Sequence, residues 1–264
     1  MTREEGRPFR SELGWSTADR IVVRGKDLPD EILGRMTLGE FAFFELTGRT
    51  PSAPEAVMFD AIVISLVDHG LTPSALATRL TYAGAPESLQ GAVAAGISGL
   101  GTMIAGTMEG AARMLTEALE ARTPGEPLDV VAATTVASYL KAGRIVPGLG
   151  HAIHKPVDPR SVRLFALAEE HGLAGDHVRL MQLIGAEAER ASGKVLPVNV
   201  TGAIGAISCE LGLDWRIVRG IAVIARTIGL VAHISEELET PLAWELWRRT
   251  DEEATRDVRE DGAG

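Results

Sequence analysis

Apolar residues recur along this chain in long stretches with the spacing of helices, and the alternation typical of strands is almost absent. The segment EAVMFDAIVISLVDH, residues 55–69, is apolar on nearly all sides, as a buried helix is. Ser52 and Glu55 have the spacing of a capping box, and Pro54 lies between them in the first turn. This pattern predicts a helix that starts near residue 53 and lies in the core.

The same periodicity, with capping residues before the segments and glycine after them, predicts most of the remaining structure. The other helical segments cover residues 73–84, 86–98, 98–115, 127–143, 159–172, 176–193, 199–212 and 214–240. We expect Asp176 and Asp214 to cap two of them, and either Asn199 or Thr201 to cap a third. Residues 21–29 are expected to be extended, and the charged ends, 1–14 and 248–264, to be frayed or mobile. The prediction is an all-α fold of roughly ten helices joined by short loops.

The composition agrees with a helical core, because aromatic residues make up only 5% of the chain and hydrophobic residues 45%. Ala, Leu, Val and Ile must therefore fill the core, which favours close-packed helices over a β-sandwich. The 264 residues suffice for one large domain or two small ones.

Charge and cysteine content exclude some function classes. A net charge of −10 argues against nonspecific binding to nucleic acid, although one local basic cluster is enough for a phosphorylated ligand. Cys209 is the single cysteine, which rules out an internal disulfide and favours a reducing compartment, the cytoplasm. We expect no signal peptide and no membrane span, because the first residues have no apolar core and no uninterrupted run of about 18 apolar residues occurs.

The loop VPGLGHAIHKPVDPR, residues 146–160, interrupts this helical pattern with a concentration of polar side chains. His151 can hold or release a proton near neutral pH, and Lys155 adds positive charge. The planar guanidinium of Arg160 suits both oxygens of a carboxylate. From these residues alone, a site for an anionic small molecule and a surface turn with incidental charges stay equally open.

The histidines and the cysteine also have interpretations that involve no ligand site. His151 and His154 have a spacing compatible with a metal, but the glycines and prolines argue against one regular helix, and no third ligand has a supportive spacing. We therefore predict no metal site. Cys209, among Ile, Ala and Leu, is expected to be a buried thiol, and His69 to complement a helix dipole at a C-terminus.

The same loop resembles the signature of the citrate synthase superfamily, in which P-G-x-G-H is followed by a basic residue and then by D-P-R. The spacing from histidine to arginine agrees, and four other stretches resemble family segments in the right order. They are LVDHG at 66–70, AGTMEGAA at 105–112, PVNVTG at 197–202 and GLVAHISEE at 229–237. The resemblance covers about residues 17–247, and the length is that of short citryl-CoA lyase-like members.

The resemblance implies an all-helical homodimer whose subunits have a large and a small domain that close over the ligand. The large domain would comprise residues 1–109 with 213–264, and the small domain residues 110–212. It also implies that the protein makes or breaks a carbon–carbon bond between a coenzyme A thioester and an oxo acid that bears carboxylates. Both would be substrates. From the charge, the apolar pattern and the histidine spacing we expect no nucleic acid, membrane or metal partner.

Roles follow from the resemblance position by position. His151 would donate a proton to the ketone oxygen of an oxaloacetate-like partner, His69 would hydrogen-bond that partner, and Arg160 would bind one of its carboxylates. Lys155 would contact a coenzyme A phosphate. The loop residues that would line the adenine end are Val146, Pro147, Gly148 and Gly150.

Two positions depart from the family pattern. Glu109 stands where the family has the histidine that stabilises the enol, and Thr201 where it has the aspartate that removes the α-proton. A threonine hydroxyl is no carboxylate base, and an ionised Glu109 would oppose enolate charge. Glu109 would act as a protonated donor, act as the base, or pair with a cationic group on another substrate.

These departures leave three functions open. The first is a lyase or synthase with a non-standard substrate or a changed acid–base set that uses Glu109 and Thr201 in the catalytic positions. The second is a non-catalytic protein that binds coenzyme A or acyl-CoA. The third is a structural helical dimer with a vestigial site.

Overall fold

The computed structural model describes residues 9–151 and 154–261, and within them the chain is helical with one small sheet. By its internal contacts the chain divides into two units, residues 1–60 and 61–264. The first unit contains three short antiparallel strands in the order β1 (Gly14–Ser16), β2 (Ile21–Val23) and β3 (Lys26–Asp27). The π-helical turn η1 (Leu28–Ile32) and helix α1 (Leu38–Thr47) follow. The extended segment predicted at 21–29 is confirmed in β2 and β3, and its last two residues already belong to η1.

The second unit carries the remaining helices, and α2 (Ala53–Val67) runs into it from the first. They are α3 (Pro73–Gly84), α4 (Leu89–Ser98), α5 (Gly106–Glu120), α6 (Leu128–Lys141), α7 (Pro159–Glu170), α8 (Asp176–Ser192), α9 (Val200–Glu210), α10 (Trp215–Glu239) and α11 (Ala243–Asp261). The predicted all-α class is confirmed. The division predicted from the family resemblance has different boundaries and stays a prediction.

Local capping explains where several helices begin. Asn199, rather than Thr201, caps α9, and its side-chain oxygen accepts the N–H groups of Thr201 and Gly202. Asp214 caps α10, as predicted. The predicted cap Asp176 is wrong, because Gly175 occupies the cap position and Asp176 lies in the first helical turn.

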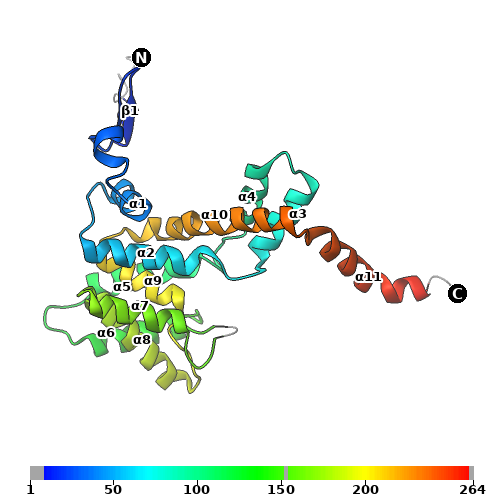
Figure 1. The fold of residues 1–264 in the computed structure, drawn as a ribbon. Helices are drawn as coiled ribbons and strands as arrows, with labels where there is room; N and C mark the ends of the chain where they lie inside the picture. Colours follow the sequence, from blue (N-terminus) through cyan, green and yellow to red (C-terminus); the bar gives the residue numbers. More distant parts are fainter. Residues whose placement is uncertain (1–8, 152–153, 262–264) are drawn as a thin grey trace, which may run out of the picture. The chain divides into compact units, whose positions relative to one another are not determined.

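Small residues let the central helices of the second unit pack closely. Helices α5 and α9 lie against each other, and a Cβ on Gly205 would lie 2.8 Å from the Met108 carbonyl oxygen. In Figure 1, α10 runs past α5 and α9 to α3 and α4, and it packs against all four. This packing brings the start of α5, the start of α9 and the middle of α10 to one place.

Helix α10 is also long and apolar enough, by length and composition, to cross a membrane. Its buried residues Val218, Ile221, Leu230 and Ile234 belong to the protein core, and a core helix passes the same test. The absence of a membrane partner stays a prediction.

The prediction that the charged C-terminal segment is a mobile tail is wrong, because α11 extends through it to Asp261. Glu245 pairs with Arg249 and Arg248 pairs with Glu252, each four residues apart on the helix surface. Such pairs support an exposed helix with little apolar surface. At the other end, residues 1–8 of the segment predicted to be frayed lie outside the described residues.

Candidate functional site

The loop after α6 is held against the segment that leads into α9. Gly148 has φ +84°, and a Cβ there would lie 2.5 Å from the Gly202 Cα, so the turn requires glycine on both grounds. The Gly148 carbonyl accepts the Asn199 N–H at 2.9 Å. The Asn199 side chain donates to the Gly150 carbonyl at 2.6 Å. The loop is therefore fixed to the N-terminus of α9 just before it delivers His151.

Asp158 organises the far end of the loop. It is fully buried, caps α7 through the Arg160 N–H and accepts the Arg160 guanidinium at 2.9 Å. It also accepts the Val200 N–H at 2.9 Å, which ties α7 to α9. Burial raises the pKa of Asp158, but hydrogen bonds from Arg160 and from the Val200 N–H outweigh it and lower the pKa below its usual value. The carboxylate therefore stays ionised and orients Arg160.

These elements enclose a cavity of about 380 Å³, which we name the histidine–arginine pocket. Its polar lining consists of His69, Thr72, Thr107, His151, Arg160, Asn199, Thr201 and Arg226. Apolar walls come from α2, α5, α9 and α10 and from the segment before α5. Of the residues predicted from sequence, the structure brings His69, Gly150, His151, Arg160 and Thr201 into this one pocket.

Three imidazoles meet at the pocket, one more than the predicted pair of His69 and His151. Nε2 of His69 lies 3.4 Å from Nε2 of His154. The His151 and His154 ring centroids are 4.4 Å apart, and Nδ1 of His151 accepts the His154 backbone N–H at 3.0 Å. Burial lowers the pKa of His151, and the charges of His154, Arg160 and His69 lower it further against the opposing effect of Asp158. His151 is therefore neutral at neutral pH.

Arg226 of α10 also lines the pocket, and this role was not predicted from the sequence. Its Nε and Nη1 atoms are buried and have no hydrogen-bond partner among the described residues. Burial lowers the pKa of Arg226, Asp68 opposes this, and Arg160 lowers it further. Burying guanidinium nitrogens without hydrogen-bond acceptors is costly, so this arrangement suits an anionic ligand. The available signal was a lone arginine within the apolar run IAVIARTIGLV, residues 221–231.

Two arginines later in the chain are engaged elsewhere. Arg248 and Arg249 lie on α11, where both are exposed and pair with Glu245. Neither lines the histidine–arginine pocket.

Thr201 is held by two neighbours in the pocket. Its hydroxyl donates to Oδ1 of Asn199 at 2.6 Å, and Oγ1 of Thr107 lies 3.0 Å away on the other side. Thr107 belongs to the first turn of α5, two residues before Glu109. The pair of hydroxyls therefore stands where the resemblance placed one catalytic side chain.

Glu109 is turned away from the lining of the pocket. Oε2 of Glu109 lies 2.8 Å from Nε of Arg219 on α10, and the two side chains are 25% and 37% exposed. Among the described residues the Arg219 Nε–H has no hydrogen-bond partner, so its contact with Glu109 is an ion pair without directed geometry. The Glu109 carboxylate is thus paired with Arg219 between α5 and α10 in this conformation.

The remaining predicted contacts lie outside the pocket lining. Lys155 is exposed on the loop. Val146 is buried, and Pro147 packs beside Gly110 of α5. Burial raises the pKa of Cys209 to about 11, which agrees with the expected inert thiol.

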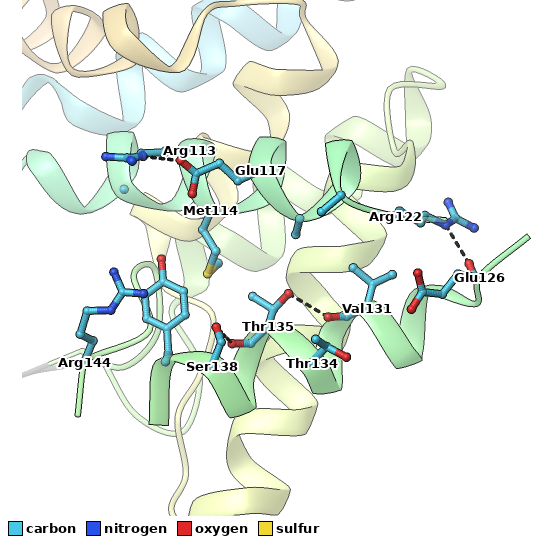
Figure 2. Close-up of a pocket in the computed structure, with 14 residues that line it drawn as sticks. Arg113, Met114, Glu117, Arg122, Glu126, Val131, Thr134, Thr135, Ser138 and Arg144 are labelled. Carbon is cyan, nitrogen blue, oxygen red and sulfur yellow. Dashed lines mark hydrogen bonds and ion pairs between the residues drawn. The ribbon is translucent and has the colours of Figure 1, made fainter. Parts of the chain in front are cut away.

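A second cavity, of about 500 Å³, lies between α5 and α6, and we name it the α5–α6 cavity. Figure 2 shows that its arginines already have partners: Arg113 contacts Glu117, and Arg122 donates to the Glu126 carbonyl. Arg144 lies over the Tyr139 ring at 4.5 Å. The larger cavity therefore offers less unsatisfied charge than the smaller one.

The fold and the pocket together define an all-α protein with a pocket at the ends of helices that two histidines and two arginines line. The family model "Citrate synthase, C-terminal domain" matches residues 24–249. The chain belongs to the citrate synthase family, which confirms the resemblance predicted from the loop.

Individual relatives agree with this assignment. Citryl-CoA lyase from Hydrogenobacter thermophilus is 34% identical, with a TM-score of 0.80 over 89% of this chain and 88% of that chain. Citrate synthase 2 from Bacillus subtilis is 28% identical over 76% of this chain. This match spans 52% of that relative, so the chain has about half the length of the curated citrate synthases it matches.

One more solved structure shares the fold. ATP citrate lyase from Methanothrix soehngenii, solved in complex with citrate and coenzyme A, has a TM-score of 0.73 over 89% of this chain and 39% of that chain. Its sequence identity is 20%, so the likeness concerns the fold alone.

Proposed function

We propose that the protein makes or breaks the carbon–carbon bond between an acyl-CoA and a carboxylate-bearing oxo acid, in the manner of a citryl-CoA lyase. The observation that carries this proposal is Arg226, which lines the same pocket as Arg160 and whose buried Nε and Nη1 atoms have no hydrogen-bond partner among the described residues. Two guanidinium groups in one pocket suit a ligand with more than one carboxylate. The 34% identity to a citryl-CoA lyase over most of both chains supports the reaction class.

In this proposal the arginines bind and the histidines act on the oxo group. Arg160, oriented by Asp158, and Arg226 would hold carboxylates of the ligand. His151 would give a proton to the ketone oxygen, or take it back in the cleavage direction, and His69 would hydrogen-bond the same ligand. The lowered pKa of His151 makes its protonated form a stronger acid than a free imidazolium.

The acid–base partner of His151 in this proposal is Glu109. Thr201 already donates its proton to Asn199 and is not a base. Glu109 is the carboxylate nearest in sequence to the pocket residues of α5, and it would act after separating from Arg219. A rearrangement of α5 against α10 when the ligand binds would release it.

Coenzyme A would lie along the loop, with its phosphates near exposed Lys155 and its adenine against residues 146–150. We further propose a homodimer in the cytoplasm, on the basis of the family resemblance and of the single cysteine.

The test is incubation of the protein with citryl-CoA, and separately with acetyl-CoA and oxaloacetate, followed by mass spectrometry of the products. Cleavage or condensation that is lost in Arg226→Met supports the proposal. Glu109→Gln should abolish turnover and leave coenzyme A binding intact. Unchanged turnover in Glu109→Gln would remove Glu109 from the mechanism.

The second candidate is a non-catalytic protein that binds coenzyme A or acyl-CoA. Its support is that both positions departing from the family pattern are engaged elsewhere, Thr201 with Asn199 and Glu109 with Arg219. It predicts saturable binding of coenzyme A without bond cleavage in any acyl-CoA and oxo acid combination. Robust turnover of one pair decides for the enzyme.

A further inference from the structure

A network of charged and polar side chains, centred on Arg79, lies behind the histidine–arginine pocket and is not part of its lining. Its members are Asp68, Arg79, His233, Glu236 and Glu237. Arg79 is only 2% exposed. Its Nε–H donates to Nδ1 of His233 at 3.1 Å, its Nη1 donates to Glu237 at 2.8 Å, and Glu236 accepts from it as well. Both carboxylates thus compensate the charge of Arg79 inside the protein.

The contact with Arg79 fixes the tautomer of His233. A guanidinium can only donate hydrogen bonds, so Nδ1 of the imidazole must accept and carries no proton. The ring proton therefore lies on Nε2, which faces Oδ1 of Asp68 at 3.0 Å. As a result His233 is a hydrogen-bond donor to Asp68.

Asp68 in turn holds the turn that carries His69. Its Oδ2 accepts the Gly70 N–H at 3.1 Å, while Oδ1 faces His233. Burial raises the pKa of Asp68, but hydrogen bonds from the Gly70 N–H and from His233 outweigh it and lower the pKa below its usual value. The ionised carboxylate therefore connects α10 to the backbone next to His69.

Helix α10 restrains the same stretch of chain at a second point. A Cβ on Gly229 would clash with the Val67 carbonyl oxygen, so the helix backbone and the end of α2 are in close contact there. Arg226, Gly229 and His233 are three and four residues apart and share one face of α10. The helix face that presents Arg226 to the pocket therefore also holds the chain just before His69.

We infer that His233 is a positioning residue: acting through Asp68, it fixes where the His69 imidazole stands relative to Arg226. The role of His69 as a ligand contact rests on the proposed function, whereas its position does not. Without the donor on His233, the Asp68 carboxylate loses its hold on α10, and the His69 ring gains freedom that a bound ligand must remove.

A measurement without ligand tests the positioning directly. In protein labelled with ¹³C at the histidine rings, the Cε1–H signal of His69 is assigned by its absence in His69→Leu. His233→Leu should shift this signal and leave that of His171, at the end of α7, unchanged. His233→Gln should return it toward the position in the parent, because a glutamine amide can accept from Arg79 and donate to Asp68.

Citrate binding then measures the consequence for the ligand. His233→Leu should weaken it about tenfold, and the loss should vanish in the His69→Leu background, because a residue that acts through His69 has nothing to act on there. A merely structural role would cost the same in both backgrounds. His177→Leu is the matched control, since His177 also contacts a carboxylate, that of Glu210, outside the pocket lining. It should bind citrate like the parent.

The outcomes separate the inference from the proposed function. If the parent binds no citrate, the proposed function fails, and the ligand-free signal of His69 still decides the inference. His233→Asn, whose amide can accept from Arg79 but is too short to reach Asp68, replaces His233→Leu if circular dichroism shows that variant to be unfolded. Three results overturn the inference: an unmoved His69 signal, no recovery in His233→Gln, or an equal loss of citrate affinity with and without the His69 imidazole.

Discussion

The histidine–arginine pocket and the α5–α6 cavity share one helix and differ in how their arginines are satisfied. In the α5–α6 cavity Arg113 pairs with Glu117, and Arg122 pairs with Asp176 and donates to the Glu126 carbonyl. In the histidine–arginine pocket Nε and Nη1 of Arg226 are buried with no hydrogen-bond partner among the described residues. The α5–α6 cavity is larger, at about 500 Å³ against about 380 Å³.

The comparison teaches that unsatisfied charge, rather than volume, marks the ligand site. In a cavity whose polar groups are already paired, a ligand can bind these groups only by replacing their present partners. A buried cation without a partner gains a full charge-assisted hydrogen bond when an anion arrives.

Arg226→Met should weaken citrate binding about 100-fold, because the variant removes a desolvated charge that faces the ligand. Its thermal midpoint should hold or rise, because two buried nitrogens without hydrogen-bond partners are removed. Calorimetric titration and thermal unfolding measure the two effects. A large loss of stability with unchanged citrate binding would mean that Arg226 is structural.

Asp158→Asn should lower the free energy of unfolding by about 2 kcal/mol, because Arg160 and the Val200 N–H lose a charged acceptor. Urea denaturation measures it. Asp214→Asn is the matched control, since Asp214 also caps a helix and pairs with an arginine two residues later, but is exposed. Asparagine caps as well as aspartate does, so the control should unfold like the parent. Equal losses in both variants would show that capping alone matters.

The pocket should also make stability depend on pH through His151. Because its folded pKa lies below the unfolded value of about 6.5, the folded chain binds fewer protons, and stability is lost as pH falls below that value through the folded pKa. The groups around it are His69, His154, Arg160 and Asp158.

Urea midpoints measured from pH 8 to pH 5 test this dependence. His151→Asn should flatten the profile over this range relative to the parent. The α5–α6 cavity is lined by no histidine and should add nothing to the slope. A profile that is identical in parent and variant would contradict the lowered pKa.

Arg113→Met should have the smallest effect of all. The Arg113–Glu117 pair is exposed on both sides, at 56% and 57%, and such pairs add little to stability. Citrate affinity should change less than about twofold, and the thermal midpoint should stay within error. A loss of citrate binding comparable to that of Arg226→Met would reverse the assignment of the two cavities.

The helices and the loop were predictable from sequence because their signals are local. Capping residues, glycines and apolar periodicity indicated α2, α3 and α10, and the P-G-x-G-H and D-P-R residues indicated His151 and Arg160. Arg226 was not predictable in the same way, since its role depends on α10 packing beside the loop and α9.

Two other differences have equally physical reasons. The cluster of His69 with His154 joins residues 85 positions apart, which no local spacing reports. The segment from Arg248 onward has the composition of a mobile tail, and only the register of Glu245 with Arg249 on the helix surface shows that α11 supports itself through ion pairs.

Asp158 has a consequence for how a ligand enters. Its carboxylate forms an ion pair with Arg160, in the place that a carboxylate of the ligand would take in the proposed function. An anionic ligand must therefore share Arg160 with Asp158 or displace the Asp158 carboxylate from it. Because the same carboxylate also accepts the Val200 N–H, any shift of Arg160 toward the ligand reaches the first turn of α9 and Thr201. One carboxylate therefore connects the arginine on one wall of the pocket to the helix on the other.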